Sequence, residues 1–168
     1  MQTVGTYTKL DEIRAILGLD KEELPDDKVE LNVYVSTLER ELKAIHKDLV
    51  AGFVQIQDIK ISERTPEQQE LYNAITIYAT YSVCKQLADV VSMYALKTIS
   101  DGKATGTRFS NATDKIVENV KKNFYGIKSI LTTLASAYYS TSTDTTGGVT
   151  NIVALGVASP ASDPVTNT

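Results

Sequence analysis

Few side chains in this sequence are of the kinds that carry out catalysis, and they do not converge on one segment. The 168 residues include one histidine, His46, and one cysteine, Cys84. His46 lies near the apolar seam of a predicted helix, so we interpret it as a helix-edge histidine rather than a general base. Cys84 lies in the most apolar helical stretch, where burial raises the pKa of a thiol and makes it inert. Since no metal-ligand spacing is present either, we predict no catalytic residues, no metal and no cofactor.

Two further patterns have weak chemical interpretations. The segment Gly102-Lys103-Ala104-Thr105-Gly106-Thr107 superficially resembles a phosphate-binding loop, but it lacks the Gly-Lys-Ser/Thr order and no buried strand precedes it. We therefore predict a loop or small hairpin from Ser100 to Asn111. Four of the nine tyrosines fall within one predicted helix and are expected to pack in the core or between subunits: Tyr72, Tyr78, Tyr81 and Tyr94.

Composition limits the classes of protein that the chain can belong to. A chain of this length with 42% hydrophobic residues can bury one moderate core, so we expect one domain over residues 1–139 and an appended tail over residues 140–168. The 17 basic and 21 acidic side chains give a net charge of −4, which disfavours non-specific binding to DNA or anionic membranes. No signal segment and no run of about 18 apolar residues is present, so we expect folding in the cytosol and no membrane contact.

The element that organises the chain is a long helix predicted from Thr65 to Ser100. It starts at a capping box, in which Thr65 and Gln68 can satisfy each other's backbone amides, and it stops at a Gly-containing turn. Apolar residues recur at helical spacing on more than one of its faces, so other helices must surround it. The predicted fold is therefore all-α, a small helical bundle around one long central helix.

The segments before this helix are predicted from periodicity. A short helix runs from Leu10 to Leu17, with Thr8 as its cap and Gly18 as its end. The acidic connector Leu19 to Asp27 leads into a long second helix whose apolar seam is Leu31, Val35, Leu38, Leu42, Ile45 and Leu49. Polar and apolar residues then alternate, which predicts a strand or extended arm over residues 53–61. Its partner is either the 101–109 loop or another subunit.

A last helix and a flexible tail follow the loop. The seam of this helix is Ile116, Val120, Phe124, Ile127, Leu131, Leu134 and Tyr138, and its exposed side is basic. From Ser140 to Asn151 the sequence is almost wholly Ser, Thr and Gly, which indicates a flexible linker. The apolar stretch after it is a predicted partner-binding strand that adds to a sheet of another chain: Ile152, Val153, Ala154, Leu155, Gly156 and Val157.

Three stretches together carry a family resemblance: the acidic connector before a long helix, Leu71-Tyr72-Asn73-Ala74-Ile75-Thr76-Ile77-Tyr78-Ala79-Thr80, and Ile99-Ser100-Asp101-Gly102-Lys103. In pattern and order, over about residues 8 to 138, they resemble the head-to-tail adaptor (connector) proteins of long-tailed bacteriophages. The resemblance implies a helical bundle that assembles as a dodecameric ring under the portal protein and continues the channel for genomic DNA. It also implies a downstream neck or tail protein as partner, and the virion as location.

From these observations we expect a non-enzymatic structural adaptor. The acidic N-terminal half and the basic last helix are expected to meet between subunits, and the DNA channel to be lined by acidic or polar side chains from Asp20 to Glu30 or the 101–109 loop. The candidate inter-subunit or channel residues are Asp26, Asp27, Glu30, Lys103, Arg108, Lys121 and Lys122.

Three alternatives remain open at this point. The first is another neck component, a stopper or tail-completion protein, which tends to be β-rich. The second is a small helical nucleic-acid-binding module, against which the net charge argues. The third is an enzyme, which would need a pocket that gathers His46 with the Ser100 to Asn111 loop.

Overall fold

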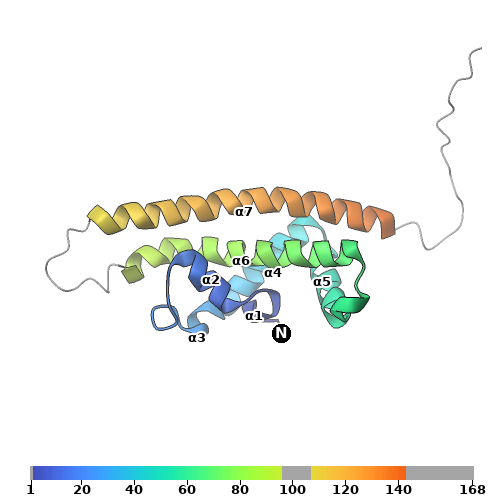
Figure 1. The fold of residues 1–168 in the computed structure, drawn as a ribbon, viewed down its shortest axis with the longest axis horizontal. Helices are drawn as coiled ribbons and strands as arrows, with labels where there is room; N and C mark the ends of the chain where they lie inside the picture. Colours follow the sequence, from blue (N-terminus) through green and yellow to red (C-terminus); the bar gives the residue numbers. More distant parts are fainter. Residues whose placement is uncertain (1, 96–106, 143–168) are drawn as a thin grey trace, which may run out of the picture.

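The computed structural model describes residues 2–95 and 107–142, and within these ranges the chain forms helices and no strands. The two longest helices, α6 (Pro66–Ala95) and α7 (Thr107–Ser142), lie side by side along the molecule (Figure 1). The Tyr78 and Phe124 rings, 5.3 Å apart, pack between them. Helix α6 also packs against α1, α2, α4 and α5, which lie mainly on its side away from α7. The predicted all-α bundle around a central helix is therefore confirmed.

Helix α6 begins as its sequence predicts. The Thr65 hydroxyl accepts a hydrogen bond from the Gln68 amide at 3.2 Å, and the Gln68 side chain accepts one from the Thr65 amide at 3.0 Å. These reciprocal bonds form the expected capping box. The core-facing side chains of α6 are fully or almost fully buried, among them Leu71, Ile75, Tyr78, Val83, Cys84 and Leu87. The predicted stop after Ser100 lies outside the described residues.

The N-terminal segment contains two short helices, α1 (Val4–Tyr7) and α2 (Leu10–Leu17). Helix α2 ends at Gly18, whose φ of 68° is left-handed and therefore suits glycine, as predicted. The predicted cap at Thr8 is wrong, because Lys9 occupies the N-cap position. The Thr8 hydroxyl instead lies 2.5 Å from the hydroxyl of Thr80 on α6, in a buried hydrogen bond that joins the two segments.

The predicted long second helix is three separate helices: α3 (Asp26–Val29), α4 (Asn32–Ile45) and the first turn of α5 (Leu49–Asp58). Leu31 is 45% exposed and lies outside the packed seam, whereas Val35, Leu38 and Leu42 are buried on α4. His46 has extended backbone angles, φ −153° and ψ 133°, which interrupt the helical hydrogen bonding. The apolar residues of the predicted seam therefore belong to separate helices and not to one.

The predicted extended arm over residues 53–61 is also wrong, because most of it is helix α5, followed by a 3-10 turn at Ile61–Glu63. The residues that α5 buries are Leu49, Gly52, Phe53 and Ile56, whose separations of three and four positions define a helical face. The alternation of polar and apolar residues that suggested a strand arose from polar residues that lie next to the buried face of this helix. A helix also satisfies the backbone groups that a lone strand would leave without partners.

Helix α7 is longer than predicted at both ends. It begins at Thr107, inside the predicted loop, and ends at Ser142, beyond the predicted boundary at residue 139. Near this end, hydroxyl side chains donate hydrogen bonds to carbonyl groups four residues earlier, as Ser136 does to Thr132 at 2.9 Å and Ser140 does to Ser136 at 2.6 Å. Polar Ser and Thr residues are thus compatible with helix here because their hydroxyls are satisfied locally.

Candidate functional site

Helix α7 has one packed face and one uncovered face. Its packed face buries Val120, Phe124 and Leu131 of the predicted seam, together with Ala135, and the other seam residues are partly buried against this core, which confirms the predicted seam. Outside this packed face, α7 carries four exposed lysines: Lys115, Lys121, Lys122 and Lys128. None of them forms an ion pair with another described residue, although two acidic residues, Asp114 and Glu118, lie on the same helix. The uncovered face of α7 is therefore a basic surface whose charges are available.

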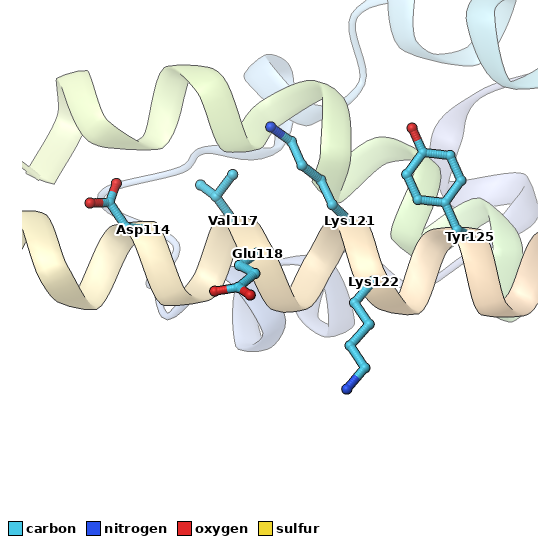
Figure 2. A pocket seen from close by; sticks show the side chains of 6 residues that line it. All are labelled: Asp114, Val117, Glu118, Lys121, Lys122 and Tyr125. Atoms are coloured by element: carbon cyan, nitrogen blue, oxygen red, sulfur yellow. The ribbon is translucent and has the colours of Figure 1, made fainter.

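An open depression lies on α7 next to α6, lined by Asp114, Val117, Glu118, Lys121, Lys122 and Tyr125. Figure 2 shows the side chains of Lys121 and Tyr125 directed toward the side of α6, and those of Glu118 and Lys122 directed away from it. Tyr125 is 61% exposed, which is unusual for a large aromatic side chain. Lys121 and Lys122 are among the residues predicted from the sequence, whereas Tyr125 is not, although an aromatic residue outside the apolar seam of α7 was a signal for it.

A polar cluster connects α4, α6 and α7 beside this depression. The Glu41 carboxylate accepts hydrogen bonds from the hydroxyls of Tyr78 at 3.1 Å and Ser82 at 2.6 Å. The Lys85 ammonium lies 3.9 Å from Glu41 and 4.1 Å from the centre of the Phe124 ring, in a cation–π contact. Burial, followed by the nearby Glu41 charge, raises the pKa of Tyr78. These contacts satisfy the polar groups between the three helices and fix α4 relative to α6.

The C-terminal end of α7 is held by a second polar contact. The Tyr139 hydroxyl donates a hydrogen bond to the Asp48 carbonyl at 3.0 Å, and its ring stacks on His46 with 4.2 Å between centroids and 2° between planes. Burial is the main cause that raises the pKa of Tyr139 to about 12. A Cβ atom at Gly52 would lie 2.1 Å from the Tyr139 hydroxyl oxygen, so this contact requires glycine. His46 therefore has a packing role at this junction.

The predicted acidic candidates differ in how far their charges are already engaged. Asp26 pairs with Lys21 at 2.9 Å and with the buried Arg14, and these hydrogen bonds, Lys21 first, lower the pKa of Asp26. Glu30 accepts a hydrogen bond from the Gly5 amide at 3.1 Å. Asp27 is exposed and only 3.9 Å from the neighbouring Lys28. Of the three, Asp27 has the most available charge.

The remaining predicted site residues are not brought together by the described structure. Lys103 and the predicted strand Ile152 to Val157 lie outside the described residues. Arg108 lies in the first turn of α7. Lys121 and Lys122 are adjacent on α7 but their side chains point in opposite directions (Figure 2), and Asp26 and Asp27 are adjacent at the start of α3, so the fold gathers no predicted candidates from different elements within the described residues.

The described residues hold no ready site for a metal or a reactive nucleophile. No group of three or more His, Cys, Asp or Glu side chains among them is arranged to hold a metal ion. Cys84 is buried as predicted, and burial raises the pKa of its thiol to about 12. In the same ranges, no helix is both long and apolar enough to span a bilayer. The clearest functional features are thus surfaces.

A scan against protein-family models and searches of curated proteins and of solved structures find no match to this chain.

Proposed function

We propose that this chain is a structural subunit of a bacteriophage neck. In this proposal it forms a ring that joins the portal vertex of the head to the tail and continues the channel for DNA. The observation that carries the proposal is the uncovered surface of α7, which over residues 114–140 packs on one face only and carries, outside that face, four exposed lysines that pair with no described residue. A long uncovered helix surface with available charges favours assembly with other chains over function as a monomer.

The form of the bundle supports a ring. The described residues make one hydrophobic core, so a subunit behaves as one block with unlike surfaces on its two sides. Blocks that contact through two different surfaces associate head to tail, and such contacts generate closed rings when the rotation per subunit divides a full turn. The resemblance of the sequence to head-to-tail adaptors implies twelve subunits in that ring.

The proposed partners follow from the resemblance and from charge. The tail segment, residues 152–157, would attach to the portal protein as an added strand, and another face of the ring would bind the next neck or tail protein. DNA would pass through without specific contacts, since the net charge of −4 gives the chain no general attraction to it. Assembly would take place in the host cytoplasm and the product would be part of the virion.

The alternative within the neck is a stopper or tail-completion protein. Such proteins tend to be β-rich, whereas residues 2–95 and 107–142 of this chain form helices only. The helical content therefore favours the adaptor role.

Electron microscopy of the full chain, alone and mixed with its portal protein, tests the proposal. We expect rings, either free or seated on the portal. A protein that neither forms rings nor binds the portal would contradict the neck role. Tight, salt-dependent binding of duplex DNA by such a protein would instead support a nucleic-acid-binding module.

A further inference from the structure

The four exposed lysines of α7, here called the basic stripe, form two rows along the helix that an acidic partner surface can match. Lys115 and Lys122 are seven positions apart, as are Lys121 and Lys128, so each pair lies on nearly the same side of the helix two turns apart. Residues 114–140 contain four lysines and only two acidic side chains. The stripe therefore has a net positive charge along about four turns of helix.

The same chain carries a surface of opposite charge. Residues 9–30 hold eight acidic and four basic side chains. One of the four bases, Arg14, is buried and engaged with Asp11, Asp26 and the Leu24 carbonyl, so the charge that it offsets is that of Asp11 and Asp26 and not that of the other six acidic side chains. Figure 1 places α3 on the far side of α6 from α7, whereas the end of α2 contacts α7, with a Cβ built at Gly18 only 3.8 Å from the Cδ1 atom of Ile116. The α3 part of the acidic segment, which includes Asp27, therefore lies away from the basic stripe of its own subunit.

Two carboxylates of this acidic surface are particularly available. Glu22 is exposed and its side chain pairs with no other described residue, and Asp27 has only a 3.9 Å contact with the exposed Lys28. An ion pair at 3.9 Å between exposed groups is weak and easily exchanged for another partner. Both carboxylates can therefore accept lysines from a second molecule.

We propose that the basic stripe of α7 binds the acidic segment, residues 9–30, of a second copy of this chain. This contact rests on the proposed function, because it supplies the head-to-tail interface from which a ring is built. Charge complementarity selects this occupant, since the two surfaces are opposite in sign and α3, at the end of the acidic segment, lies on the side of α6 away from α7. Contact between two copies of the stripe would instead oppose lysine to lysine.

Tyr125 gives the proposed contact an apolar centre. It lies one turn from Lys121 and Lys122 in the open depression, and 61% of its surface is exposed. Tyrosines with this setting commonly anchor protein interfaces because they bury a large ring at low entropic cost and retain a hydroxyl for a polar partner. Replacement by alanine, Tyr125→Ala, is expected to weaken association by about tenfold or more.

A charge-swap complementation experiment tests the proposal. One variant carries Lys121→Glu and Lys122→Glu, and the other carries Glu22→Lys and Asp27→Lys. Each variant alone opposes like charges at every contact, so its association should weaken by at least about tenfold in sedimentation velocity. An equimolar mixture places opposite charges at every contact again and should recover assembly. Circular dichroism checks that each variant remains folded.

The control variant carries Lys43→Glu and Lys47→Glu, two exposed lysines of the α4 end, and has the same change in net charge as the first variant. It should assemble like the native chain. A mixture that assembles no better than its components, or a control that fails equally, would overturn the proposed contact.

The same samples, mixed with portal protein, separate this contact from the neck function. Native chains that form rings on the portal while the Lys121→Glu, Lys122→Glu variant does so equally well would refute the contact and leave the function standing. Native chains that neither self-associate nor bind the portal would refute both.

Discussion

Replacing Gly52 by alanine tests the junction between α5 and the C-terminal end of α7. The added Cβ would lie 2.1 Å from the Tyr139 hydroxyl oxygen, far inside van der Waals contact, so the tyrosine side chain must move. Its displacement breaks the hydrogen bond to the Asp48 carbonyl and separates the ring from His46. The loss of folding stability expected for this substitution therefore comes entirely from a residue 87 positions away in sequence.

The expected magnitude follows from three terms. Loss of the Tyr139 hydrogen bond costs about 1 kcal/mol, and loss of the ring stack costs about 0.5 to 1.5 kcal/mol. Alanine in place of glycine inside a helix stabilises the folded chain by about 1 kcal/mol, which offsets part of these losses. We expect a net decrease of about 1 kcal/mol in the free energy of unfolding. In a Tyr139→Ala background the first two terms are absent, so Gly52→Ala should then stabilise by up to about 1 kcal/mol.

Gly126 provides a matched control on the other long helix. No heavy atom lies within 4 Å of a Cβ built at Gly126, so Gly126→Ala should stabilise by about 1 kcal/mol in either background. Urea unfolding followed by circular dichroism at one protein concentration measures the native chain, the Tyr139→Ala chain and each glycine substitution in both backgrounds. If Gly52→Ala stabilises the native background as much as Gly126→Ala does, the packing argument for Tyr139 is wrong.

Four further predictions concern the core, its charges and the tail. Glu41→Ala should cost about 2 to 3 kcal/mol in urea unfolding, since two hydroxyls lose their acceptor, and a value near zero would contradict the role of that cluster. Hydrogen bonds lower the pKa of Asp26 in the folded chain, so its contribution to stability is complete above the unfolded pKa, about 3.9, and is lost as pH falls below it. Asp26→Asn should therefore reduce the loss of stability at acid pH, and the same pH dependence of the unfolding free energy in both proteins would refute the assignment. Cys84 should resist iodoacetamide at pH 8 until the chain unfolds, and rapid labelling of folded protein would contradict its burial. Deletion of residues 150–168 should leave the helical spectrum unchanged and abolish stable attachment to the portal, and a truncated chain that co-purifies with heads would refute the role of the tail.

The sequence determined the features that depend on near neighbours. The capping box of α6 joins residues three positions apart, so its residue types alone predict it. The end of α2 at Gly18 follows from the left-handed conformation that glycine adopts freely. The seams of α6 and α7 and the burial of Cys84 follow from helical periodicity, which is a property of consecutive residues. The basic stripe with Lys121 and Lys122 was likewise visible as the complement of a seam.

Only the tertiary structure decided the features that depend on distant residues. At the break around His46, the Tyr139 ring stacks on His46 and its hydroxyl bonds to the Asp48 carbonyl, a contact that spans 91 residues. Periodicity along the chain carries no information about such a partner, so the sequence favoured one long helix followed by a strand. The hydrogen bonds of Glu41 with Tyr78 and Ser82 were likewise not predictable from the sequence, since only the fold brings α4 beside α6. Side-chain contacts across helices, more than local preference, set these boundaries because they supply most of the free energy of burial.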